Sequence, residues 1–253
     1  MTSLNELFDV SRKKVFVTGA SSGIGRSAAT CLAEAGAQVV AIARRADRLK
    51  EWSDETNGRT SYFVADVSNK NQIKNIVEKI IKAEGSPDIL INAAGLNTRE
   101  HADDVTLEGW DKTLDLNLST PFFIAQTVIE EMKKRKWGRI INYASLASRR
   151  ALPSSIAYGA SKGGIEQLTR AMAEAWSPFG INVNAIAPGF FPTELTVPVF
   201  NDKERSIRNA KQTCIGRNGE LNDLNGPLLF LCSKSSDYVT GQLIFVDGGF
   251  TAK

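Results

Sequence analysis

Seven short apolar runs alternate with longer segments of helical periodicity along this chain of 253 residues. Strands that are apolar on both faces need cover on both faces, which is typical of a parallel sheet between two layers of helices. The crossovers between such strands are expected to be right-handed. The predicted strands are Lys14–Thr18, Gln38–Ala43, Ser61–Ala65, Asp88–Asn92, Gly138–Asn142, Ile181–Ile186 and Leu243–Val246.

The segments between these runs predict helices and one irregular stretch. Asn69–Ala83 carries an apolar stripe at helical spacing, Trp110–Lys136 is long enough for one helix or two, and another helix runs from near Tyr158 to about Phe179. Between residues 188 and 219 the alternation breaks down, which is more typical of a functional lid than of filler. No linker or repeat divides the chain, so residues 1–253 are expected to form one α/β domain.

The composition excludes several classes of function. The net charge is +3, and the one dense basic run, Lys133–Lys136, lies at the end of a predicted helix, where cations complement the helix dipole. We expect no nucleic-acid partner. A single histidine, His101, leaves no Ser-His-Asp triad. The three cysteines show no metal-ligand spacing, and their odd number argues against a disulfide framework.

The targeting signals in the sequence favour a cytoplasmic protein. Met1–Val10 is mixed polar and acidic, unlike a secretory signal peptide. No apolar run approaches the length of a membrane span. We therefore expect no membrane partner.

A glycine-rich segment, Thr18–Gly25, follows the first predicted strand and opens the first predicted helix. A helix N-terminus offers unpaired N–H groups, and glycine lets a pyrophosphate approach the backbone. The spacing G-x-x-x-G-x-G differs from the general dinucleotide fingerprint, and a glycine-rich turn without a ligand is the alternative. The predicted phosphate-binding residues are Gly19, Ser21, Ser22, Gly23, Ile24 and Gly25.

The end of the second strand reads Ala43-Arg44-Arg45, where an acidic residue would bind the ribose 2′-hydroxyl of NAD. Ala43 removes the repulsion that a carboxylate would exert on a 2′-phosphate, and Arg44 can bind that phosphate through several donors. The sequence favours NADP(H), although arginines that merely solvate a loop are the alternative. Asp66 and Val67 are expected beside the adenine, and Asn92, Ala93 and Gly95 near the ribose.

A candidate proton-transfer site combines Tyr158, Lys162 and Ser145. Residues four positions apart share one face of a helix, so Tyr158 and Lys162 are expected to be neighbours. A free tyrosine has a pKa of about 10, and a nearby ammonium lowers it by stabilising the phenolate. Tyr158 would then exchange a proton with an alcohol or carbonyl, to which Ser145 hydrogen-bonds. Many surface helices carry such a pair without function.

Together these motifs resemble the short-chain dehydrogenase/reductase family from about Lys14 to Gly249. The resemblance implies a single-domain Rossmann-type fold, a doubly wound parallel sheet of about seven strands with helices on both faces, and a homotetramer. It also implies a catalytic tetrad that matches Asn117, Ser145, Tyr158 and Lys162.

The resemblance assigns a role to each of these residues. Tyr158 would be the general acid in ketone reduction and the general base in alcohol oxidation, while Ser145 holds the substrate oxygen. Lys162 would lower the pKa of the tyrosine and bind the nicotinamide ribose, and Asn117 would hold a water that relays protons from Lys162. Further positions that match cofactor contacts are Pro188, Gly189 and Thr193. At Ala93 the family more often has asparagine.

The substrate is a small carbonyl or alcohol, and its class is only weakly indicated. Three stretches of scaffold sequence resemble the gluconate and ketodeoxygluconate dehydrogenases, but also the oxoacyl-carrier-protein reductases. An arginine would hold a substrate carboxylate, or else merely solvate a loop. The candidate substrate residues are Asn97, Leu146, Arg149, Arg150, Phe191 and Glu194.

The sequence therefore predicts an NADP(H)-dependent carbonyl reductase or alcohol dehydrogenase. One alternative is a non-catalytic NADP-binding regulator on the same fold, which would have no need of Tyr158 beside Lys162. Another is a nucleotide-sugar epimerase, which normally has a larger separate substrate region.

Overall fold

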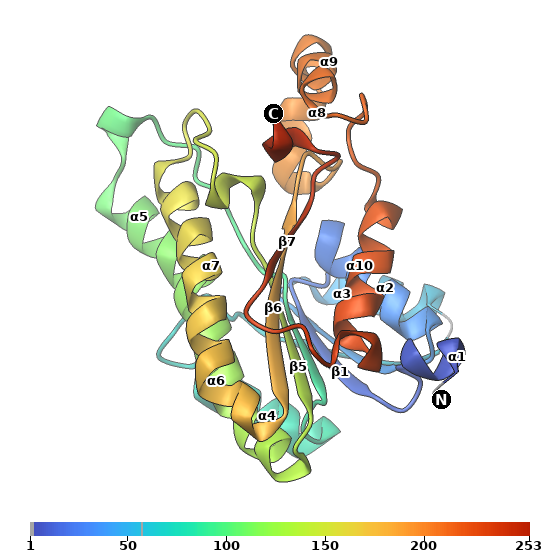
Figure 1. Ribbon diagram of the computed structural model, residues 1–253. Helices are drawn as coiled ribbons and strands as arrows, with labels where there is room; N and C mark the ends of the chain where they lie inside the picture. Colours follow the sequence, from blue (N-terminus) through green and yellow to red (C-terminus); the bar gives the residue numbers. More distant parts are fainter. Residues whose placement is uncertain (1–2, 57) are drawn as a thin grey trace.

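The computed structural model describes residues 3–56 and 58–253; Met1, Thr2 and Asn57 of the predicted 1–253 domain lie outside this range. Seven parallel strands form one sheet in the order β3-β2-β1-β4-β5-β6-β7 (Figure 1). The strands are β1 (Lys14–Thr18), β2 (Gln38–Ala43), β3 (Arg59–Val64), β4 (Ile89–Asn92), β5 (Gly138–Tyr143), β6 (Ile181–Pro188) and β7 (Leu243–Val246). The predicted fold class is confirmed.

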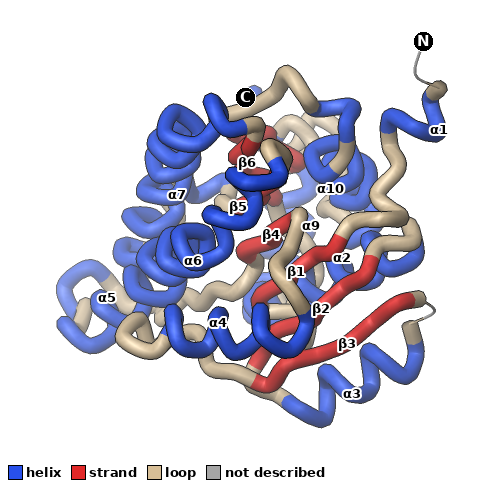
Figure 2. Tube along the Cα trace, turned by 90° about the horizontal axis from the view of Figure 1, so that it is seen from below, coloured by secondary structure: helices blue, strands red, loops and turns tan. Residues whose placement is uncertain are grey.

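Helices cover both faces of this sheet (Figures 1 and 2). On one face lie α2 (Gly23–Glu34), α3 (Ala46–Glu55) and α10 (Asn225–Cys232); on the other lie α4 (Ile73–Glu84), α6 (Thr120–Arg135) and α7 (Ile156–Trp176). The remaining helices are α1 (Leu4–Leu7), α5 (Leu107–Leu114), α8 (Val197–Phe200) and α9 (Lys203–Gln212). Among the described residues, no helix has both the length and the apolar content that a membrane crossing requires.

Side chains on the two faces of the central strands pack into two separate hydrophobic cores. In β1, Val15 and Val17 pack with α2 and α10, whereas Phe16 packs with α4 and α6. Successive side chains of a strand point to opposite faces, so both faces must be apolar where helices cover both. Every residue of β5 and β6 is buried. Both strands nevertheless contain buried polar residues, namely Arg139, Asn142, Asn182 and Asn184.

The edge strand β3 departs from the predicted pattern. It begins at Arg59, two residues before the predicted Ser61, and its residues alternate between half-buried and exposed. Tyr62 and Val64 are exposed, and only β2 pairs with this strand. The apolar signal of an edge strand is correspondingly weaker.

The long segment Trp110–Lys136 forms two helices, α5 and α6, joined by a π-helical turn at Asp115–Ser119. Helix α5 begins at Leu107, after Thr106 caps its N-terminus by accepting a hydrogen bond from the Gly109 N–H. A π-turn inserts an extra residue into the helical ladder and is frequent at functional sites. Here it carries Asn117.

The irregular segment 188–219 follows β6 and contains a short turn, Glu194–Thr196, and the helices α8 and α9. It leaves the sheet at the carboxyl ends of the strands (Figure 1). The glycine segment after β1 and the loops after β4 and β5 leave the sheet at that same edge, because all the strands run in one direction. Ligands of open parallel sheets bind at this edge.

Candidate active site

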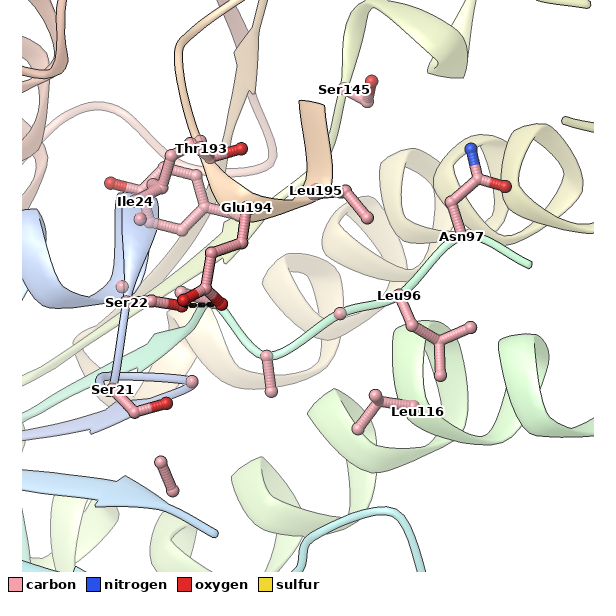
Figure 3. A pocket seen from close by; sticks show the side chains of 18 of the residues that line it. Ser21, Ser22, Ile24, Leu96, Asn97, Leu116, Ser145, Thr193, Glu194 and Leu195 are labelled. Carbon is pink, nitrogen blue, oxygen red and sulfur yellow. Dashed lines mark hydrogen bonds between the residues drawn. The ribbon is translucent and has the colours of Figure 1, made fainter. Parts of the chain in front are cut away.

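A cavity of about 560 Å³ lies at the carboxyl edge of the sheet and extends from the glycine segment to Ser145 and Asn97 (Figure 3). Most of the residues predicted from sequence line it. They are Gly19, Ser21, Ser22, Gly23, Ile24, Gly25, Arg44, Arg45, Asp66, Val67, Ala93, Gly95, Asn97, Ser145, Tyr158, Lys162, Pro188, Gly189, Phe191, Thr193 and Glu194.

Five predicted site residues do not line the cavity: Asn92, Asn117, Leu146, Arg149 and Arg150. Asn92 and Asn117 are buried beside it and hold the surrounding loops together. Leu146 is buried in the turn that follows Ser145.

The glycine segment makes a tight connection between β1 and α2. Gly19 has a φ of 70°, in the left-handed region, and a Cβ placed there would lie 2.7 Å from the Cα of Ala94. A Cβ on Gly25 would overlap the carbonyl oxygen of Gly19. Glycine is therefore required on both sides of this turn. The result is an exposed backbone cradle at the N-terminus of α2, which suits a pyrophosphate.

Side chains behind this cradle connect the neighbouring strands. The Thr18 hydroxyl accepts hydrogen bonds from the N–H groups of Ala93 and Ala94, at 3.1 and 3.2 Å. Asn92 donates to the Asn142 side chain at 2.9 Å. The glycine segment and the loop after β4 are thus held at a fixed separation.

Two arginines follow β2, and they have different partners. Arg44 is largely exposed, with Asp66 3.9 Å away. Arg45 donates to both carboxylate oxygens of Glu194, at 3.0 Å each, and also to the hydroxyls of Ser21 and Ser22. Since Glu194 belongs to the 188–219 segment, this ion pair crosses the phosphate end of the cavity.

Helix α7 supplies Tyr158 and Lys162, and β5 leads to Ser145. The Lys162 ammonium is buried and donates to the carbonyl of Tyr143, the last residue of β5, at 2.6 Å. It lies 5.7 Å from the centre of the Tyr158 ring. The Ser145 hydroxyl accepts from the N–H of Ala147 at 3.1 Å, which orients it at the start of its turn. The three side chains share one end of the cavity.

Burial dominates the protonation of this group. It lowers the pKa of Lys162 to about 8. It also raises the pKa of Tyr158, while a hydrogen bond from Ser145 and the Arg99 charge act in the opposite direction. The sequence predicted a lowered pKa for Tyr158 from the lysine alone; desolvation of the phenol raises it instead, and the opposing charge is that of Arg99. At neutral pH the pair is a protonated phenol beside a cationic lysine.

Asn117 joins three elements around Lys162. Its side-chain oxygen accepts from the N–H of Leu96 at 2.9 Å, and its amide donates to the Leu96 carbonyl and to the Ser161 hydroxyl. The π-turn is therefore tied both to the loop after β4 and to α7. The predicted water relay through Asn117 stays a prediction.

The structure pairs Arg149 and Arg150 with groups outside the cavity. Arg149 donates to the carboxylate of Glu166 on α7, with a shortest distance of 2.6 Å. Arg150 donates to the backbone carbonyl of Lys253 at 3.2 Å. The first contact fastens the turn after Ser145 to α7, which suits a positioning role rather than the predicted contact with substrate.

Arg99 is a residue that the sequence did not single out. It lies in the loop after β4 with a φ of 58°, its charge acts on Tyr158, and it donates to the carbonyl of Leu195. The loop containing Arg99 was recognisable as part of the cavity mouth. Only the contacts of the folded chain distinguish Arg99 from Arg149 and Arg150.

No cluster of three or more metal-ligating side chains occurs in residues 3–56 and 58–253. The cavity is lined instead by backbone, hydroxyl and cationic groups, the donors that phosphates accept from. These residues fit a dinucleotide.

Comparison with known proteins agrees with this geometry. Residues 19–251 match the sequence model of a family described as enoyl-(acyl carrier protein) reductase, a branch of the short-chain dehydrogenases/reductases. Gluconate 5-dehydrogenase of Gluconobacter oxydans is 37% identical over 97% of each chain. An NAD-dependent glycerol dehydrogenase of Listeria innocua is 38% identical over 97% of this chain and 96% of its own.

Among solved structures, a gluconate 5-dehydrogenase from Burkholderia cenocepacia, in complex with NADP and tartrate, superposes with a TM-score of 0.94. It is 34% identical, and the match covers 99% of this chain and all of the other. The family model and these relatives extend over nearly the whole chain, and the predicted resemblance is confirmed. The chain therefore belongs to the short-chain dehydrogenase/reductase family of oxidoreductases.

Proposed function

We propose that this protein is an NADP(H)-dependent oxidoreductase that interconverts a ketone and a secondary alcohol on a small sugar acid. The observation that carries the proposal is the continuity of one cavity from the glycine cradle to Ser145, Tyr158 and Lys162. A bound nicotinamide would supply or accept the hydride at that end. The Burkholderia relative contains NADP, and the Gluconobacter relative is named for gluconate.

The residues after β2 support the choice of NADP(H). Ala43 ends the strand where a carboxylate would oppose a 2′-phosphate, and Arg44 and Arg45 line the cavity beside it. Their guanidinium groups would bind a phosphate with several charge-assisted hydrogen bonds. The Listeria relative is NAD-dependent, so cofactor preference varies among similar chains.

The proton transfer is assigned to Tyr158. Its raised pKa keeps the phenol protonated at neutral pH, so it can donate to the oxygen of a ketone as that oxygen gains charge. Ser145 would donate to the same oxygen, and the Lys162 cation stabilises the phenolate that remains. In the oxidative direction the same groups act in reverse, with Tyr158 as the base.

A carboxylate on the substrate would find its partner in Arg99. Arg99 donates to the neutral carbonyl of Leu195, a residue that lines the cavity, and its charge acts on the catalytic phenol. Arg149 is instead paired with the Glu166 carboxylate, and Arg150 donates to Lys253, which does not line the cavity. An arginine binds a carboxylate through two parallel hydrogen bonds. A sugar acid is therefore favoured over an uncharged polyol and over an oxoacyl thioester.

A non-catalytic NADP-binding regulator is the alternative. It is disfavoured because a binding protein gains nothing from burying Lys162 beside Tyr158 at a cost in solvation. The expected homotetramer, the cytoplasmic location and the lid role of residues 188–219 stay predictions.

Tyr158→Phe tests the reaction itself. Loss of the phenolic proton should lower kcat by about 10²- to 10⁴-fold while leaving the dissociation constant of NADPH close to unchanged. Turnover is followed by NADPH and NADH absorbance with keto sugar acids, polyols and oxoacyl thioesters. The control is Tyr238→Phe, a fully exposed tyrosine. Retained turnover in Tyr158→Phe contradicts the mechanism; tight NADPH binding without turnover of any substrate favours the regulator.

Arg44→Asp tests the cofactor preference. A carboxylate beside the 2′-phosphate should lower kcat/KM for NADPH by roughly tenfold or more, with a smaller effect for NADH. Arg12→Asp makes the same change of charge on an exposed residue outside the cavity. An unchanged ratio of NADPH to NADH efficiency shows that Arg44 does not contact the phosphate.

Stability against pH tests the buried state of Lys162. Between about pH 8 and 10.5 the folded lysine has lost its proton while the unfolded one keeps it, so stability rises with pH. Relative to Lys162→Met, the wild type should gain on the order of 2 kcal/mol in unfolding free energy between about pH 7.5 and 9.5. Urea unfolding of both proteins measures the difference. A difference that does not depend on pH contradicts the lowered pKa.

Arg99→Gln tests the substrate class. The KM for a gluconate-type acid should rise about tenfold, whereas that for a polyol without a carboxylate should change less than about twofold. Steady-state kinetics with both substrates provide the comparison, and Arg150→Gln serves as the control. Equal effects of Arg99→Gln on both substrates would show that Arg99 does not bind the carboxylate.

A further inference from the structure

The carboxylate of Glu194 lies against the part of the cavity that is built to bind phosphate (Figure 3). Both of its oxygens accept from Arg45 at 3.0 Å, and one also accepts from the Ser22 hydroxyl at 2.9 Å. Arg45 is further braced by the Ser21 hydroxyl, at 3.0 and 3.2 Å. The Glu194 carboxylate thus occupies an anion site whose donors are the Arg45 guanidinium and the Ser22 hydroxyl, while Ser21 holds the guanidinium in place.

The position of this anion site in the chain indicates its ligand. Ser21 and Ser22 belong to the glycine segment that opens α2, and Arg45 comes two residues after β2. Residues near the end of β2 contact the ribose 2′-oxygen of a bound dinucleotide, or the phosphate attached to it. A phosphate monoester, with more charge and more acceptor oxygens than a carboxylate, would make the same bidentate contact with arginine.

We propose that the Glu194 carboxylate is an internal competitor for the 2′-phosphate of NADP(H) at Arg45 and Ser22. The phosphate has to displace the Glu194 carboxylate, so part of its binding energy is used in breaking the ion pair with Arg45. Glu194, predicted from the sequence as a substrate residue, then acts on cofactor selection instead. This inference rests on the proposed use of NADP(H).

The same exchange affects the 188–219 segment. Residues 194 and 195 are held by two arginines from different loops, Arg45 through the Glu194 carboxylate and Arg99 through the Leu195 carbonyl. Displacement of Glu194 by a phosphate would release the first contact and leave the second. NAD(H), without the phosphate, would leave both in place.

Glu194→Gln removes the competing charge and keeps the size of the side chain. The Glu194 side chain is 57% exposed, so the variant should fold normally, which thermal unfolding checks. Isothermal titration with 2′,5′-ADP and with ADP measures the phosphate site without any turnover. We expect the affinity for 2′,5′-ADP to rise roughly fivefold and that for ADP to change less than about twofold.

Further variants test whether the effect depends on the ion pair between Arg45 and Glu194. Glu204→Gln makes the same change of charge on α9 within the same segment, outside the cavity, and should leave both affinities unchanged. Arg45→Ala should weaken 2′,5′-ADP by about tenfold, and adding Glu194→Gln to it should give no further gain.

The outcomes separate this inference from the proposed function. If the wild type binds 2′,5′-ADP more tightly than ADP but Glu194→Gln leaves that ratio unchanged, competition by Glu194 is overturned while NADP(H) use stands. If Glu194→Gln still raises the affinity for 2′,5′-ADP when Arg45 is replaced by alanine, the assigned site is overturned, because the effect of Glu194 would then not depend on Arg45. If the wild type binds both nucleotides equally, the preference for NADP(H) and the inference fail together.

Discussion

The parallel pairing of β1 with β4 and of β4 with β5 is the constraint on which the site depends. Because these strands point the same way and are in register, their carboxyl ends deliver the glycine segment, the loop with Asn97 and the turn with Ser145 to one edge. Helix α7 then completes the arrangement through the bond from Lys162 to the last carbonyl of β5. A slip in either pairing would separate the phosphate end of the cavity from the proton-transfer end.

The arginines at the carboxyl edge of the sheet differ in the groups that they contact. Arg149 braces the turn after Ser145 against α7, Arg45 is paired with Glu194, and Arg99 donates to the Leu195 carbonyl. Each arginine therefore has a different function although all three lie in loops at the carboxyl edge. The buried Lys162 is the costly member of the site, since desolvation moves its pKa toward neutrality.

Several strands and the glycine segment were predictable from the sequence, because each depends on residues that are close together in the chain. The bounds of β1, β2 and β7 follow from short apolar runs, and the glycine segment follows from a turn that excludes a Cβ at Gly19 and Gly25. The partners of Glu194 and Arg149 were not predictable, because they lie 149 and 17 residues away along the chain. The raised pKa of Tyr158 likewise depends on burial, which spacing from a lysine does not reveal.

The proposed mechanism requires the cavity to place the transferable hydride beside the substrate carbon whose oxygen exchanges a proton with Tyr158. Reduction of a keto sugar acid with NADPH carrying deuterium at the transferable position tests this most directly, with the product analysed by NMR. We expect one deuterium on the new carbinol carbon, delivered to a single face. A reduced product without deuterium at that carbon, or with deuterium on both faces, would contradict it.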